Sequence, residues 1–113
     1  MVLDEGVLSR PIGGPDVMRK QLERLLETTR APHITVQICP LGANPGLSGG
    51  IVIAKAPNGT RSTVYLETAA EPLVTSHAEV VEVVTMKLDA IRADALPQRV
   101  SVEFIRKMVG KWT

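Results

Sequence analysis

Apolar and polar residues alternate along 34–39, where Ile34, Val36 and Ile38 are each followed by a polar or small residue. A period of two sends successive side chains to opposite faces of a strand, which predicts a strand with one apolar face. A second β-rich region, 51–67, is interrupted by Asn58-Gly59. Asn-Gly favours a tight turn because both residues tolerate a positive φ angle. The pattern therefore predicts a strand near 34–39 and an antiparallel hairpin over 51–67.

Three other segments, 15–30, 77–94 and 98–109, carry apolar residues three and four positions apart, the period of a helix with one buried face. Pro15 suits the first turn of the first of these helices, and Gly110 is a C-cap candidate for the last. Ser76 and Glu79 have the spacing of a capping box at the start of the middle one. The middle helix has a wide apolar surface, which predicts burial on more than one side; its apolar residues are Val80, Val81, Val83, Val84, Met86, Leu88 and Ile91.

These elements predict an α+β fold. We expect a small, mainly antiparallel sheet (strand near 34–39, hairpin 51–67) covered by an amphipathic helix 15–30 and two C-terminal helices 77–94 and 98–109. The apolar start at 1–3 has the length of a strand stub. Pro72 excludes a central strand after the hairpin but allows a short edge strand at 73–75. With 113 residues, the chain has the length of one domain.

Composition narrows the classes of function. The formal net charge is +1, with 13 basic and 12 acidic residues interleaved, and only Tyr65, Phe104 and Trp112 are aromatic. A protein that binds nucleic acid needs a basic surface or stacking aromatic residues, so this chain alone is not expected to bind it. A single cysteine, no long apolar run and no signal-like start predict a cytoplasmic protein that does not enter a membrane.

Few residues suggest chemistry. Gly46-Leu47-Ser48-Gly49-Gly50 matches the G-x-S-x-G pattern of serine hydrolases, but that motif needs a helix after the serine, and here a predicted strand follows. A hydrolase using Ser48 is therefore the least favoured alternative. His33 and His77 have no partner at metal-ligand spacing, and Cys39 is expected to be a packed thiol. We predict no catalytic, cofactor-binding or metal-binding residues.

A series of short motifs runs through nearly the whole chain in one order. They are Leu3-Asp4-Glu5, Val7-Leu8, Arg10-Pro11-Ile12-Gly13-Gly14-Pro15, Val17-Met18, Gln21-Leu22, Leu25-Leu26, Ile34-Thr35-Val36-Gln37, Pro40-Leu41, Pro45-Gly46-Leu47-Ser48-Gly49, Val64-Tyr65-Leu66-Glu67, Asp89-Ala90-Ile91-Arg92-Ala93-Asp94-Ala95-Leu96 and Ser101. In this order and spacing the chain resembles an actinobacterial domain of unknown function. That domain is the C-terminal domain of Cro/cI-like (XRE) helix-turn-helix regulators in the WhiJ-like, antitoxin-like family.

The resemblance implies a non-enzymatic regulatory module. Such regulators begin with a helix-turn-helix domain, and its motifs are absent from this sequence. The chain would therefore be a single, N-terminally truncated regulatory domain over residues 1–113 that does not itself bind DNA. Its expected partner is a small protein encoded beside such regulators, a second copy of the chain, or both. A truncated remnant without independent function is the main alternative. The residues predicted to contact the partner are Asn44, Gly46, Leu47, Ser48, Tyr65 and Glu67.

Overall fold

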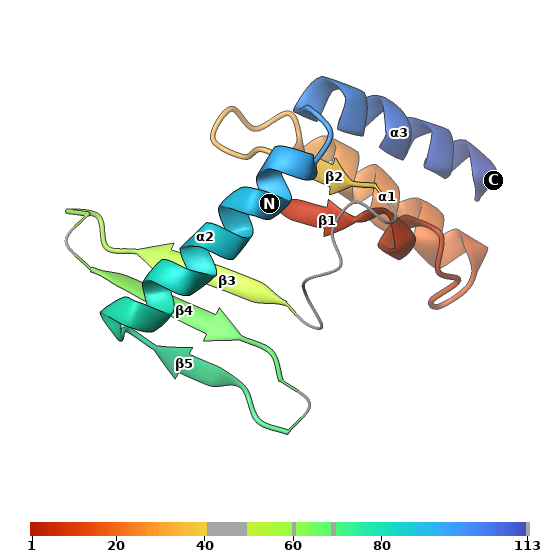
Figure 1. The fold of residues 1–113 in the computed structure, drawn as a ribbon. Helices are drawn as coiled ribbons and strands as arrows, with labels where there is room; N and C mark the ends of the chain where they lie inside the picture. Colours follow the sequence, from red (N-terminus) through yellow and green to blue (C-terminus); the bar gives the residue numbers. More distant parts are fainter. Residues whose placement is uncertain (41–49, 60, 69, 113) are drawn as a thin grey trace. The chain divides into compact units, whose positions relative to one another are not determined.

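The computed structural model describes residues 1–40, 50–59, 61–68 and 70–112. The chain divides into two compact units, one made of Met1–Asn44 with Ile91–Thr113 and the other of Pro45–Ala90 (Figure 1). The first unit contains a parallel pair of strands, and the second contains a three-stranded antiparallel sheet. The α+β class predicted from the sequence is thus confirmed.

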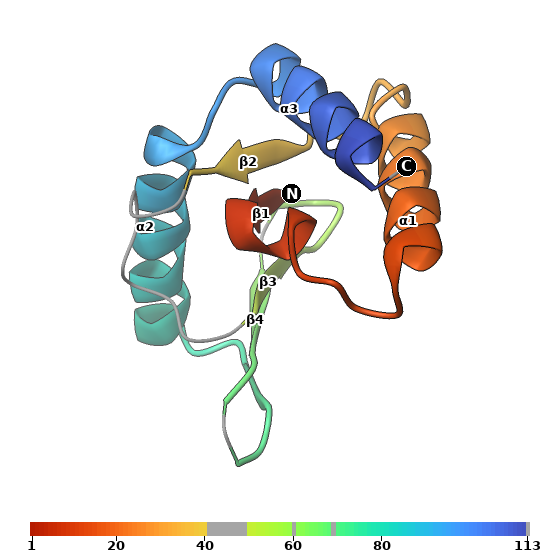
Figure 2. The same ribbon diagram turned by 90° about the vertical axis from the view of Figure 1, so that its right-hand side faces the viewer.

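The first unit is organised around strands β1 (Val2–Asp4) and β2 (Gln37–Cys39), which pair in parallel. Between them the chain forms the 3-10 helix η1 (Glu5–Leu8) and helix α1 (Pro15–Thr28). Parallel pairing requires such a crossover, because the chain must return to the same end of the pair before the second strand begins. Helix α3 (Gln98–Lys111) packs beside α1 (Figure 2).

The core of the first unit joins both helices to the strand between them. Helices α1 and α3 each turn an apolar stripe inward, as their sequence period requires. Full burial of one large aliphatic side chain is worth about 1.5–3 kcal/mol. The buried residues of this cluster are Leu8, Leu22, Val36, Ile38, Ile105 and Met108. Their packing is therefore the main source of the unit's stability.

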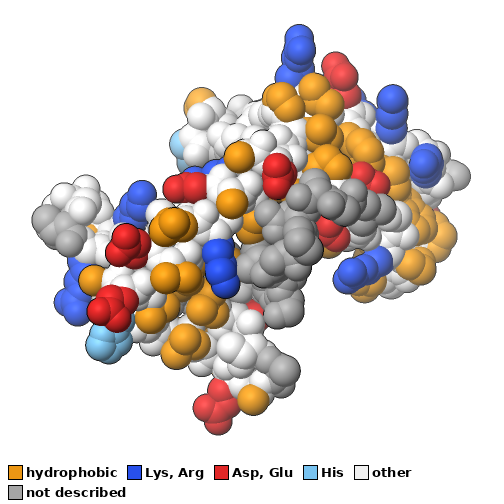
Figure 3. All heavy atoms as spheres, viewed as in Figure 1, with side chains coloured by type: hydrophobic (Ala, Val, Ile, Leu, Met, Phe, Trp, Pro, Cys, Tyr) orange, Lys and Arg blue, Asp and Glu red, His pale blue; other side chains and the backbone are white. Residues whose placement is uncertain are grey.

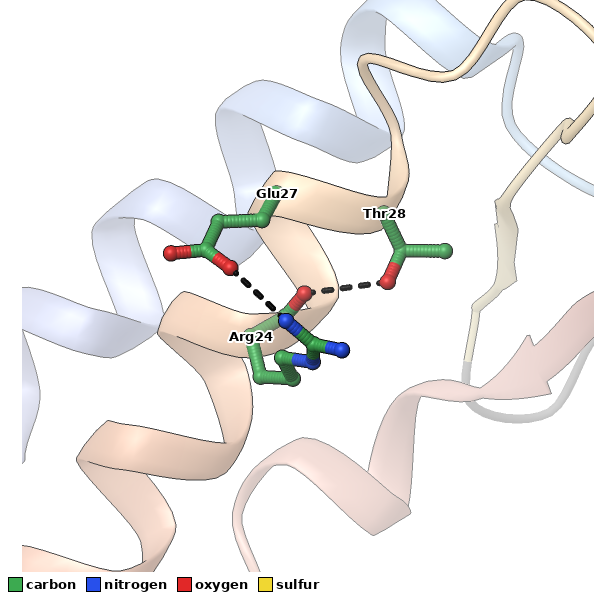
Figure 4. A network of polar contacts seen from close by, with 3 residues as sticks. All are labelled: Arg24, Glu27 and Thr28. Atoms are coloured by element: carbon green, nitrogen blue, oxygen red, sulfur yellow. Dashed lines mark hydrogen bonds and ion pairs between the residues drawn. The ribbon is translucent and has the colours of Figure 1, made fainter.

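The exposed side of α1 carries a small polar network (Figure 4). Arg24 forms an ion pair with Glu27 at 3.1 Å, and the Thr28 hydroxyl donates to the Arg24 carbonyl at 3.0 Å. An exposed pair of this spacing on a helix contributes only about 0.2–0.5 kcal/mol. The network thus contributes little to a helix that is held mainly by its buried residues, Met18 and Leu22.

The second edge of β2 is bonded to the start of α3 and to Leu96 just before it. The Val36 N–H donates to the Gln98 side chain at 3.2 Å, and the Ile38 N–H donates to the Ser101 hydroxyl at 2.9 Å. The Leu96 N–H in turn donates to the Ile38 carbonyl at 2.8 Å. These contacts take the place of a third strand, so both edges of β2 are occupied.

The second unit is an antiparallel sheet with strand order β3-β4-β5, formed by β3 (Ile51–Lys55), β4 (Ser62–Leu66) and β5 (Leu73–Thr75). The predicted hairpin is present, but its turn is longer than a two-residue Asn58-Gly59 turn. The Gly59 N–H donates to the Ala56 carbonyl at 2.9 Å, and Gly59, but not Asn58, has a positive φ angle (70°). The predicted edge strand at 73–75 is also present. Figures 1 and 2 show the residues of helix α2 (Ala78–Asp94) that belong to this unit lying across one face of the sheet.

Among the described residues of this unit, helix α2 is buried on one side only. Val64 in the centre of the sheet and Val84 on the helix are both buried. Val83 and Met86, by contrast, are 53% and 66% exposed, and Figure 3 shows apolar side chains at the surface over α2. The prediction that this helix is buried on more than one side is therefore wrong, because the three-stranded sheet covers only one of its faces.

One strand prediction and one helix-cap prediction also need correction. The strand near 34–39 is shorter than expected, and it pairs in parallel with β1 instead of joining the hairpin's sheet.

The hydrogen bonds of a capping box at Ser76 are not formed. The Ser76 hydroxyl lies 2.8 Å from that of Thr63, and the Thr75 hydroxyl accepts from the His77 N–H. A bond to the sheet has thus replaced a local helix cap.

The end of α3 differs from the sequence expectation. The helix continues through Gly110 to Lys111, so Gly110 is not its C-cap. Trp112 is half-buried, and its indole N–H donates to the Leu8 carbonyl at 3.0 Å. The last turn is extended because Trp112 has both an apolar surface and a hydrogen-bond partner in η1.

Candidate functional site

The outer edge of β3 presents backbone groups that bond to no other described strand. Gly50 and Ala56 flank the strand, and both bond to residues that flank β4. The Glu67 N–H donates to the Gly50 carbonyl at 3.0 Å, and the Ala56 N–H donates to the Arg61 carbonyl at 2.9 Å. Antiparallel pairs alternate between bonded and non-bonded positions. The N–H and C=O groups of Ile51, Ile53 and Lys55 therefore point away from β4.

The other strand edges are less open. At the outer edge of β5, the alternation of bonded and non-bonded positions leaves the Val74 N–H pointing outward. This strand has only three residues, however, and it follows Pro72, which has no N–H to donate. The second edge of β2 is occupied by contacts from the start of α3. Strand β1 ends after three residues, where Asp4 caps η1. Within the described part of the chain, β3 thus has the longest edge available to another strand.

An apolar row crosses the sheet face that α2 does not cover. Val52 pairs with Tyr65, and Tyr65 pairs with Val74, so the three side chains lie in register on one face. Val52 is 57% exposed and Val74 is 62% exposed, while Tyr65 is half-buried. Cross-strand pairs of aromatic and β-branched residues stabilise a sheet by about 0.2–1 kcal/mol each. The row also leaves an apolar surface next to the β3 edge.

Two charged side chains, Glu67 and Lys55, lie near the two ends of β3. One carboxylate oxygen of Glu67 accepts from the Gly50 N–H at 3.2 Å, just before β3 begins. Lys55 is the last residue of β3 and is exposed. Neither side chain forms an ion pair with another described residue. By the hairpin register, the Glu67 side chain lies on the face of Val52 and Tyr65, whereas Lys55 lies on the opposite face with Ile51 and Ile53.

The structure describes two of the six residues that were predicted to contact a partner. Tyr65 lies in the apolar row, and Glu67 lies beside the start of β3. Asn44, Gly46, Leu47 and Ser48 fall outside the described residues, and so does the hydrolase prediction for Ser48. Sequence reasoning did not single out Ile51, Val52 or Ile53. Their roles follow from the hairpin register, which the Asn58-Gly59 turn could have indicated.

The reactive side chains of the first unit do not form a second site. Cys39 is buried, and its pKa is raised by that burial and further by the carboxylates of Asp94 and Asp4. A raised pKa keeps the thiol protonated, whereas the thiolate is the reactive form. Residues 1–40, 50–59, 61–68 and 70–112 contain no group of three or more His, Cys, Asp or Glu side chains placed to hold a metal ion. The β3 edge and its apolar row remain the candidate functional surface.

Comparison with known proteins gives one match. The model of a family described as a domain of unknown function (DUF5753) matches residues 1–107. No curated protein and no solved structure shows a significant match. Among the helices in the described ranges, none has the length and hydrophobicity needed to cross a lipid bilayer.

Proposed function

The chain belongs to the DUF5753 family, and on that premise we propose that it is a non-enzymatic protein-interaction module. In this proposal it is the regulatory part of an antitoxin-like, XRE-type transcriptional regulator and acts in the cytoplasm. Its partner is a small protein encoded beside such regulators, a second copy of the chain, or both. The chain does not bind DNA by itself. The resemblance of its ordered motifs to such regulators supports this role.

The open edge of β3 is the observation that carries the proposal. Edge strands that do not serve for binding are normally short, interrupted by proline or charged along their length. β3 instead has the apolar run Ile51-Val52-Ile53, and its only charged residue, Lys55, is at the end. An extended segment added to such an edge gains backbone hydrogen bonds, while neighbouring side chains provide specificity. The exposed row that includes Val52 and Tyr65 is placed to provide those contacts.

Co-purification tests this function. We expect the tagged chain to retain the small protein encoded beside its gene, or an untagged copy of itself, after co-expression. Val52→Lys places a charge next to the β3 edge and is expected to reduce the retained amount by about tenfold. Val74→Lys is the matched control, because Val74 lies in the same row at the opposite edge. Failure to retain either partner, or equal losses in both variants, would contradict the proposal.

A further inference from the structure

We propose that the second unit, Pro45–Ala90, opens and closes as one piece while the first unit stays folded. Each sheet is complete within one unit, β1-β2 in the first and β3-β4-β5 in the second. Parts of one protein can open with different free energies, from near zero up to that of global unfolding. This opening needs no partner, so it goes beyond the proposed function.

The interiors of the two units differ in size. In the second unit, the buried apolar side chains among the described residues are those of Val64 and Val84. The first unit buries a larger set, drawn from η1, α1, the segment 36–39, the end of α2 and α3. They are Leu8, Met18, Leu22, Val36, Ile38, Cys39, Ile91, Ile105 and Met108. Because burial of apolar surface is the main stabilising contribution to folding, the second unit has the weaker interior.

Both outer faces of the second unit leave apolar side chains in water. Val52 and Val74 lie on the sheet face that α2 does not cover, and Val83 and Met86 lie on the outer side of the helix. All four are more than half exposed. A domain of ~60 residues is already marginal in the surface that it can bury, and Pro45–Ala90 is shorter than that. Folding of this unit therefore gains little free energy from burial.

Helix α2 indicates where the opening ends. Its residues up to Ala90 belong to the second unit, whereas Ile91, which is buried, belongs to the first. The second-unit part has four β-branched residues, which lose side-chain freedom in a helix: Val80, Val81, Val83 and Val84. A short helix of this composition needs tertiary packing to form. When the sheet opens, α2 should therefore unravel from its N-terminus toward Ile91.

Such an opening gives a partner a way to control the whole second unit. A molecule that binds only the closed form shifts the equilibrium toward that form by mass action. Under the proposed function, a strand added at the β3 edge would order α2 together with the sheet. The opening itself is a property of the unbound chain and is measured without a partner.

Native-state hydrogen exchange of the full chain in low concentrations of urea tests this opening. The Tyr65 N–H in β4 and the Val84 N–H in α2 should share one protection factor and one dependence on urea. The Ile38 N–H, which donates to the Ser101 hydroxyl, and the Ile105 N–H in α3 should be protected at least about 100-fold more strongly. Equal protection in the two units, or different protection at Tyr65 and Val84, would overturn the proposal.

Matched valine truncations in the two units provide a second test. Val64 and Val36 are both 0% exposed, and they lie in different units. Val64→Ala should lower the protection of the two second-unit amides at least about tenfold and leave the two first-unit amides within about twofold of wild type. Val36→Ala should have the reverse effect. If Val64→Ala unfolds the second unit completely, the first-unit amides should still be protected. Equal loss of protection in both units from either variant would show that the chain unfolds as a single piece and would overturn the proposal.

Discussion

Ile105→Ala is expected to destabilise the first unit by about 2–5 kcal/mol, the largest effect predicted for a single substitution in this chain. Ile105 is 0% exposed and lies in the cluster that joins α1, α3 and β2. Its truncation removes buried apolar surface and leaves a cavity that the surrounding side chains fill only in part. A small domain has about 5–15 kcal/mol of total stability, so this loss is a large fraction of it.

Urea unfolding followed by the fluorescence of Trp112, the only tryptophan, measures this effect in the first unit. Ile12→Ala is the matched control, because it removes the same atoms from a side chain that is 66% exposed. We expect the control to change the free energy of unfolding by no more than about 0.5 kcal/mol. Similar losses in the two variants would show that Ile105 is not part of a packed core.

Ser101→Ala is expected to destabilise the same unit by about 1–3 kcal/mol, although it removes a single oxygen atom. The Ser101 hydroxyl is fully buried, accepts from the Ile38 N–H at 2.9 Å and donates to the Leu96 carbonyl at 3.2 Å. Removing it leaves two backbone groups without these bonds in a place that water does not reach. Buried polar groups that lose their partners carry a full desolvation penalty.

The same urea titration compares Ser101→Ala with Ser9→Ala. The Ser9 hydroxyl donates to the Gly6 carbonyl at 3.4 Å in an exposed position, where water can replace it. Its loss should change the free energy of unfolding by no more than about 0.5 kcal/mol. If Ser101→Ala is equally mild, α3 does not close the second edge of β2 in the way described.

Local signals in the sequence predicted much of the fold. Asn58-Gly59 correctly indicated the position of the hairpin, because Gly59 accepts the positive φ angle that the turn requires, although Asn58 does not adopt one. Pro15 is at the first position of α1, as expected. Such features depend on a few neighbouring residues, so they can be recognised without knowledge of tertiary contacts.

The wrong predictions concerned contacts between distant parts of the chain. Alternation in 34–39 indicated a strand but could not identify β1 as its parallel partner. The apolar residues of α2 indicated a wide buried surface, yet Val83 and Met86 are exposed because no described element of that unit covers them. Ser76 has the spacing of a cap, but its hydroxyl lies against Thr63.

The candidate site could be predicted only in part. Tyr65 and Glu67 were chosen for their place in the hairpin; Tyr65 lies in the apolar row, and the Glu67 carboxylate accepts from the Gly50 N–H just before β3. The register of β3 against β4 decides which β3 residues turn their backbone groups outward. This register is known only from the structure. The alternating pattern alone gives the faces of a strand but not its bonded positions.

Amide hydrogen exchange along β3 tests most directly whether this edge takes up another strand. In dilute protein, the Ile53 amide should exchange fast, while those of Val52 and Ala54, which bond to β4, should exchange slowly. Raising the concentration, or adding the neighbouring protein, should slow exchange at Ile53 and leave the Val74 amide at the other edge unchanged. An Ile53 amide that is already protected in dilute protein, or one that stays unprotected when a partner binds, would contradict the account.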